Sequence, residues 1–300
     1  MPIRWPWGAV VCWEGIRDAG PQILGLALRR GKPMPIITIS RGAYSRGKEV
    51  AEKVAQRLGY QCIAREVLLE ASEKFNIPEI KLLQDVHDAH ASLERFLYGK
   101  EQYLAYIQNT LLRLVQKDNV VYHGFGDHFF FKDVGHVLKV LILADIQDRV
   151  KLVMEREGIV RQALRYVKTV DEERRKWGKL FYGVDIFDPR LYDLILHIKK
   201  VTVDDAVDII CHTAKLKNFQ ATPESRRALD DLVLASEVKA ALIDMKPDVE
   251  VSAKRGEVFV RTKAPEGEEE ELIGRIEEIA KGVPGVTQVK VQAIPAVFPG

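Results

Sequence analysis

Apolar and polar residues along the first two thirds of the chain predict strands and helices in turn. Five short apolar runs have the length and β-branched content of buried strands, at 36–40, 60–63, 119–122, 137–144 and 194–198. Apolar residues recur at helical spacing between and after them, over 47–58, 65–75, 79–88, 91–117, 147–157, 160–179 and 202–217. This alternation favours an α/β fold, a doubly wound parallel sheet of the P-loop NTPase type with right-handed crossovers.

The pattern changes after 218–223 and predicts a second, smaller α+β unit. A helix is expected first, then two alternating strands, a second helix and a third strand, at 224–244, 249–253, 257–262, 268–281 and 286–291. The chain therefore divides into an extension over 1–33, a large domain over 34–217 and an αββαβ domain over 224–292. Met34 directly precedes the first strand, so we expect translation of the functional protein to begin there.

Polar residues at three predicted helix starts have the types that stabilise a helix N-terminus. Thr202 and Asp205 have the spacing of a capping box. The acidic run 268–271 lies in a first turn, where negative charge opposes the helix dipole. Asp145 follows the most apolar strand; it could organise Mg²⁺ there, but capping of the next helix is the favoured interpretation.

Composition adds limits to this picture. The 300 residues are 47% hydrophobic and 29% charged with a net charge of +2, which indicates a globular protein with no overall attraction to nucleic acid. Cys12, Cys62 and Cys211 are far apart, so neither a disulfide framework nor a zinc knuckle is predicted. No apolar run reaches the roughly 18 residues of a membrane span, and we expect a cytoplasmic protein.

The turn after the first strand has the spacing of a phosphate-binding loop. Gly42, Gly47 and Lys48 form G-x-x-x-x-G-K between an apolar strand and a helix. Glycine lets the backbone approach an anion, the N–H groups at the helix start point at it, and the lysine adds a charge. Glu49 stands where a Ser or Thr usually holds Mg²⁺. The alternative is an ordinary strand-turn-helix connection.

Several segments together resemble the cytidylate kinase-like family of P-loop nucleoside monophosphate kinases. They are ITISRGAYSRGKEVAEKVAQRLGY, AREVLLEAS, VLILADIQDRVKLVMEREGI, the D-x-x-R of Asp171 to Arg174, and YGVDIFDPRLYDLIL, within about 35–215. The tail, over about 224–292, resembles a BON domain in AKRGEVFV and IAKGVPGV.

The kinase resemblance implies transfer of the γ-phosphoryl group of ATP, with Mg²⁺, to a nucleoside monophosphate, most often CMP or dCMP. Its implied catalytic residues are Lys48, Arg149 and Arg174. Its implied nucleotide-binding loop comprises Gly42, Ser45, Arg46, Gly47, Lys48 and Glu49. Its implied substrate-binding residues are Arg65, Arg156, Asp185 and Asp188.

Simpler interpretations stand beside these roles. The arginines after Asp145 also fit a solvated helix face that pairs with Glu155 and Glu157. Asp188 and Pro189 also fit a turn before the last strand. Relatives carry a Gly-Arg-Gly-like motif after the third strand whose arginine is expected to hold the monophosphate, but HGFG at 123–126 has no arginine. Ala64 also replaces an expected acidic residue before Arg65.

His123, Asp127 and His128 have a spacing that could bind a metal, but no second cluster accompanies them. Hydrogen-bonded or solvated histidines are the favoured interpretation, and we predict no resident metal site.

Two functions therefore remain open. The first is a cytoplasmic nucleotide kinase; the second is a non-catalytic nucleotide sensor that signals through its tail. The BON-like tail is expected to bind a protein or phospholipid, or to assemble copies into a homo-oligomer. Nucleic-acid binding is not expected, because no basic stripe interleaved with aromatic residues occurs.

Overall fold

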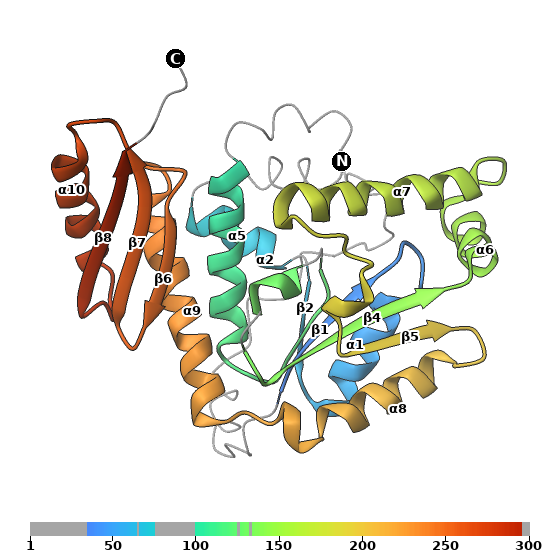
Figure 1. The fold of residues 1–300 in the computed structure, drawn as a ribbon. Coiled ribbons are helices and arrows are strands. Elements are labelled where there is room, and N and C mark those ends of the chain that lie inside the picture. Colours follow the sequence, from blue (N-terminus) through green and yellow to red (C-terminus); the bar gives the residue numbers. More distant parts are fainter. Residues whose placement is uncertain (1–34, 65, 76–99, 125–126, 132–133, 296–300) are drawn as a thin grey trace, which may run out of the picture.

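The computed structural model describes residues 35–64, 66–75, 100–124, 127–131 and 134–295 (Figure 1). Several predictions lie wholly or partly outside these residues. They concern the extension over 1–33 and the expected start at Met34, Arg65, the short helix over 79–88, the start of the long helix expected from 91, and positions 125–126 of the HGFG segment.

A five-stranded parallel sheet forms the centre of the large domain. Its strands are β1 (Ile36–Arg41), β2 (Gln61–Ile63), β3 (Val120–Tyr122), β4 (Val137–Ala144) and β5 (Leu194–Ile198). The order is β2-β3-β1-β4-β5 and all neighbours run parallel, which confirms the predicted fold class. Because β1 is central, the turn that follows it lies between the ends of β3 and β4.

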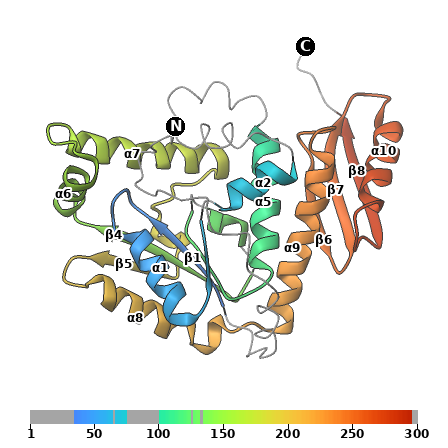
Figure 2. The same ribbon diagram turned by 180° about the vertical axis from the view of Figure 1, so that it is seen from behind.

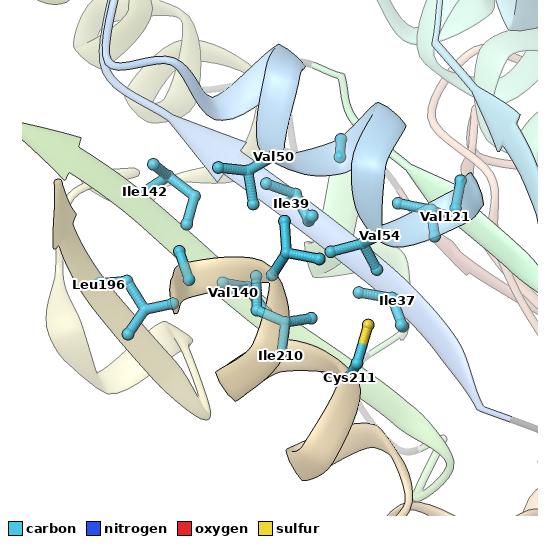
Figure 3. Packing of buried hydrophobic residues seen from close by; sticks show 14 of the residues in the cluster. Ile37, Ile39, Val50, Val54, Val121, Val140, Ile142, Leu196, Ile210 and Cys211 are labelled. Atoms are coloured by element: carbon cyan, nitrogen blue, oxygen red, sulfur yellow. The ribbon is translucent and has the colours of Figure 1, made fainter. Parts of the chain in front are cut away.

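Helices cover both faces of this sheet. On one face, α1 (Gly47–Leu58) and α8 (Val203–Ala214) pack against alternate residues of β1 and β4, with Val50 and Ile210 among the buried contacts (Figure 3). On the other face, α2 (Glu66–Lys74) and α5 (Lys100–Val115) cover the remaining strand residues, which point the opposite way, such as Ile36. Burial on both faces explains why these strands read as continuous apolar runs.

Two more helices follow β4. They are α6 (Ile146–Glu157) and α7 (Ala163–Trp177), which pack on each other through Val153 and Val167. A π-helical turn (Gly178–Tyr182) and a short 3-10 helix (Pro189–Leu191) then lead into β5. Further 3-10 turns are formed by Asp127–Phe131 and Lys217–Phe219.

The C-terminal unit has the predicted αββαβ order. It comprises α9 (Pro223–Leu242), β6 (Glu250–Lys254), β7 (Glu257–Ala264), α10 (Glu269–Lys281) and β8 (Gln288–Pro295). Strand β7 is central, antiparallel to β6 and parallel to β8.

Helix α9 joins the two units, because it lies alongside α5 (Figures 1 and 2). Its Leu229 and Val233 are buried in the same apolar cluster as Ile36 of the central strand. Asn109 Nδ2 of α5 donates to Ser236 Oγ at 3.0 Å, and both side chains are buried. The C-terminal unit therefore shares part of its core with the large domain.

The helix starts agree with prediction except at Asp145. Thr202 and Asp205 form the predicted capping box, and the acidic residues after Glu268 lie in the first turn of α10. Asp145 occupies the N-cap position of α6, but its side chain makes no capping hydrogen bond, so that prediction is wrong. The carboxylate instead pairs with Lys199 and lies 3.2 Å from His197 Nε2, because β5 and the turn after it place these side chains beside the end of β4.

Candidate nucleotide site

The turn between β1 and α1 is held to the neighbouring strand. Gly42 N–H donates to the carbonyl of Ile142 in β4 at 3.2 Å, and Ser45 N–H donates back to the carbonyl of Gly42 at 3.3 Å. The buried Ser45 hydroxyl lies 2.9 Å from the Ile142 carbonyl and 3.0 Å from that of Gly42. Ser45 therefore fixes the shape of the loop from inside. Tyr44 and Arg46 adopt positive φ angles of 55° and 62° within it.

The two glycines of the loop face different arginines. A Cβ atom on Gly47, the first residue of α1, would lie 2.6 Å from Arg41 Cβ, a distance that real side chains do not reach. A Cβ atom on Gly42 would lie 3.6 Å from Arg149 Cζ, an ordinary contact. The close approach of Arg41 to the helix start therefore requires glycine at 47 but not at 42.

On the side of α6 and α7, three side chains bond the loop, and we call Arg149, Asp171 and Arg174 the lid flank. Arg149 Nε donates to the Ala43 carbonyl at 2.6 Å, and Arg149 Nη2 pairs with Asp171 Oδ2 at 2.5 Å. Asp171 Oδ1 accepts from Ala43 N–H at 2.8 Å. A loop N–H therefore already binds a negatively charged oxygen.

Arg174 completes this flank by donating from Nη1 to the Arg41 carbonyl at 2.7 Å. Burial, together with the smaller effect of the neighbouring positive charge of Arg41, lowers the pKa of Arg174 to about 10. The group stays protonated at neutral pH, but its charge is poorly solvated. The neighbouring guanidinium groups of Arg41 and Arg174 repel each other, so an anion bound between or beside them would be stabilising.

On the side of β3 lie Arg41, Lys48 and His123, which we call the β3 flank. His123 is only 6% exposed, and its backbone N–H donates to the Ile63 carbonyl at 2.9 Å. Burial lowers the pKa of His123 to about 4, with smaller contributions from the charges of Arg41 and Lys48. The ring is therefore neutral at pH 7. It is buried, so of the two predicted environments for this histidine, hydrogen-bonded or solvated, the solvated one is wrong.

The predicted loop residues lie together at the start of α1. Lys48 is exposed, with its Nζ 3.7 Å from Glu52, and Arg46 lies 3.5 Å from Glu49. Arg149 and Arg174 are brought to the same loop from 106 and 133 residues away. Arg149 is buried, so its interpretation as part of a solvated helix face is wrong.

The other predicted substrate residues lie further from the loop contacts. Arg156 is exposed in the last turn of α6, two turns beyond Arg149. Asp185 accepts from Phe187 N–H at 3.0 Å and lies 3.4 Å from Arg175 Nε. Asp188 accepts from Arg190 N–H at 2.9 Å, which confirms the turn before β5.

Two residues of the site were not predicted as such. Arg41 directly precedes the glycine motif, and a charged residue at the end of a buried strand is the signal that points to it. Asp171 was named only as the first residue of D-x-x-R. Its bond to a loop N–H spans 128 positions and has no local sequence signal.

No metal centre is defined in the parts of the chain that the structure describes. There, no three His, Cys, Asp or Glu side chains converge to hold an ion. The side chains of Asp127 and His128 lie outside the described atoms, so the histidine spacing is not tested. In the same described parts, no helix is both long and apolar enough to cross a membrane.

The parallel sheet with its glycine loop between β1 and α1 is the fold of a P-loop kinase. Residues 36–200, more than half of the chain, match the model of the cytidylate kinase-like family. The chain belongs to that family.

Curated relatives agree with this assignment. A cytidylate kinase of Archaeoglobus fulgidus is 29% identical over 190 residues, which cover 61% of this chain and 97% of the relative. A cytidylate kinase of Pyrococcus horikoshii is 24% identical over 176 residues, 58% of this chain and 85% of the relative. Among solved structures, an uncharacterized protein from Eubacterium ventriosum aligns over 61% of this chain and 99% of its own, with 26% identity and a TM-score of 0.48.

Proposed function

We propose that this protein transfers the γ-phosphoryl group of ATP to a nucleoside monophosphate, with CMP or dCMP as the favoured acceptor. The observation that carries the proposal is the loop over 42–48, which has Arg41 and Lys48 near His123 on one side and Arg149 and Arg174 bonded to it or to the strand end before it on the other. Similarity to cytidylate kinases supports the same activity and favours it over a non-catalytic sensor.

In this reaction the protein positions two phosphates and neutralises charge, because phosphoryl transfer needs little covalent chemistry from side chains. The loop N–H groups and Lys48 would bind the donor phosphates. Arg149 and Arg174 would stabilise the transferring charge, and Arg65, Arg156, Asp185 and Asp188 stay proposed substrate contacts.

Mg²⁺ would bind with the nucleotide. Glu49 replaces the usual hydroxyl, and Ser45 uses its hydroxyl inside the loop, so the described residues fit an ion held mainly by phosphate oxygens and water. When bound, the ion supplies further neutralisation of phosphate charge.

The direct experiment measures ADP release with ATP and Mg²⁺ while the acceptor is varied among CMP, dCMP, UMP and AMP. We expect turnover with at least one acceptor and the highest kcat/KM with CMP or dCMP. Folded protein that binds ATP but turns over none of the four would contradict the kinase and favour the sensor.

We infer that the C-terminal αββαβ unit is a BON-like module that binds anionic phospholipid. Its strand β7 buries Val258 and Val260 and exposes Phe259, and Lys290 Nζ lies 5.0 Å from that ring. Exposed Ile294 of β8 pairs with Lys263 on the same face. An exposed face that mixes aromatic and basic side chains suits a lipid headgroup layer.

Sedimentation of the full chain with anionic and with neutral vesicles tests this module. We expect binding to anionic vesicles only, and its loss in a Phe259→Ser, Lys290→Glu variant. Lys281→Glu on α10 makes the same change of charge and should bind normally. Equal vesicle binding by the unaltered protein and both variants would exclude phospholipid as the ligand. A protein ligand or self-association would then remain, and light scattering measures self-association.

The proposed substrates are cytoplasmic metabolites, so we propose that the protein is cytoplasmic.

A further inference from the structure

Arg41 occupies an unusual position for a charged residue. It is the last residue of the central strand, and its side-chain stem rests on Gly47 at the start of α1. Strands β1 and β3 are parallel neighbours, with Thr38 level with Tyr122. The residues that follow β3, beginning with His123, therefore reach the same edge of the sheet as Arg41.

The positive charge of Arg41 is not balanced by a bonded carboxylate. Within the described part of the chain, no Asp or Glu forms an ion pair or hydrogen bond with its guanidinium group. Glu52 is near enough to raise the pKa of Arg41, but burial lowers that pKa by more, and Glu52 itself is exposed and paired with Lys48. A partly buried cation without a bonded partner is costly unless a ligand supplies the negative charge.

On the lid flank, by contrast, a carboxylate is bonded to a guanidinium group. There Asp171 pairs with Arg149 and accepts from the loop, so one carboxylate already serves that side. On the β3 flank, His123 is neutral and its buried Nδ1 atom has no hydrogen-bond partner among the described residues. An oxyanion bound there would reach Arg41 without displacing a carboxylate, and Lys48 has only the exposed Glu52 beside it.

The four residues after β3, HGFG at 123–126, contain no arginine. A nucleoside monophosphate nevertheless carries a phosphate that needs a cation when it lies in line with a donor phosphate. A guanidinium group suits this role because its planar fork can donate two parallel hydrogen bonds to phosphate oxygens.

We propose that Arg41 binds the phosphate of the acceptor nucleoside monophosphate and supplies the cation that the segment after β3 lacks. The inference rests on the proposed kinase function and assigns the two cations of the β3 flank to different ligands. Lys48 and the loop N–H groups serve the donor, and Arg41 serves the acceptor.

The experiment compares Arg41→Met, which keeps the stem on Gly47 and removes the charge, with Arg41→Lys, which keeps the charge and removes the fork. Steady-state kinetics are measured separately against ATP and against the best acceptor. We expect Arg41→Met to raise KM for the acceptor about 10- to 100-fold and KM for ATP by less than about 3-fold. Arg41→Lys should raise the acceptor KM about 3- to 10-fold.

Arg57→Met provides the matched control, because it removes the same charge from the exposed last turn of α1. Its kinetics should equal those of the unaltered protein. If Arg41→Met does not fold, Arg41→Lys decides, since an unchanged acceptor KM in that variant overturns the proposal. Equal increases in both KM values also overturn it, because Arg41 would then shape the whole loop.

Calorimetry separates failure of this inference from failure of the proposed function. If the unaltered protein transfers no phosphate, the kinase proposal fails, and CMP is titrated into each protein with a non-hydrolysable ATP analogue bound. Binding that Arg41→Met loses and Arg57→Met keeps would still support an acceptor-type phosphate at Arg41. Equal or absent binding in all proteins would overturn it.

Discussion

The lid flank and the β3 flank approach the same loop but differ in how their charges are satisfied. Arg149, Asp171 and Arg174 are bonded to each other or to loop backbone atoms. Arg41 has no bonded carboxylate in the described chain, Lys48 has only the exposed Glu52 at 3.7 Å, and the nearby His123 is neutral. The comparison teaches that the charged groups of the lid flank are bonded within the molecule, whereas we propose that those of the β3 flank are satisfied by a ligand. Substitution of Asp171, which has no proposed ligand, should mainly reduce stability, whereas substitution of Lys48 should mainly reduce activity.

The largest difference should come from Lys48→Met on the β3 flank. We expect kcat/KM to fall about 10²- to 10³-fold, because a charge at the developing phosphate is lost. Unfolding should change by less than about 1 kcal/mol, since the exposed Lys48–Glu52 pair contributes little. The coupled ADP assay and thermal unfolding measure the two effects. Lys53→Met, further along α1, is the control, and equal loss of activity in both would argue against a specific role.

Next in size is Asp171→Asn on the lid flank. This substitution removes the carboxylate charge and leaves the guanidinium group of Arg149 buried without its charged partner. We therefore expect a loss of about 3 kcal/mol in the free energy of unfolding. Urea denaturation of Asp171→Asn, Arg149→Met and the double variant should show a double loss smaller than the sum. Arg261→Met breaks an exposed pair with Glu250 and should cost under about 1 kcal/mol. Strict additivity would show that the two lid-flank residues act independently.

The buried His123 should make stability depend on pH. Its folded pKa of about 4 lies below the ordinary value of 6.5, so the unfolded chain binds the proton more readily between these values. The contribution is complete above about pH 6.5 and decreases as the pH falls towards 4, by up to about 3 kcal/mol. Urea titrations from pH 4 to 8 should show the decrease, and His123→Gln should lose that part of the slope. Parallel curves for the two proteins would contradict the assignment.

The smallest effects should distinguish the two glycines. The new Cβ atom in Gly47→Ala would clash with the Cβ atom of Arg41, which is next to the backbone and cannot easily move. We expect a loss of about 1 to 3 kcal/mol in stability. Gly42→Ala meets only the end of Arg149 at an ordinary distance and should change stability by about 0.5 kcal/mol or less. Thermal unfolding of both variants provides the comparison. Equal losses of stability in the two variants would mean that the Arg41 side chain moves aside as easily as that of Arg149.

Much of the fold could be predicted because buried parallel strands are continuous apolar runs. Strands β4 and β5 have the predicted bounds, and the capping box at Thr202 was visible as two residues three apart. The loop was also predictable, because its glycines and lysine lie within seven positions. These features depend on neighbours in the sequence.

The rest depends on contacts between distant residues. The network of Asp171 with Ala43 and Arg149 forms only when α7 folds over the loop. The predicted cap at Asp145 is wrong because Lys199, from the turn that follows the adjacent strand, pairs with the same carboxylate. The pattern of α9 marked the start of a second unit but did not show that Leu229 and Val233 turn towards the first.

That shared packing of α9 has a consequence for how the molecule melts. Removal of the chain from Pro223 onwards would expose apolar residues along α5. It would also remove Leu229 and Val233 from the apolar cluster that contains Ile36 of the central strand. The C-terminal unit therefore stabilises the large domain, and we expect heat to unfold both in a single cooperative transition.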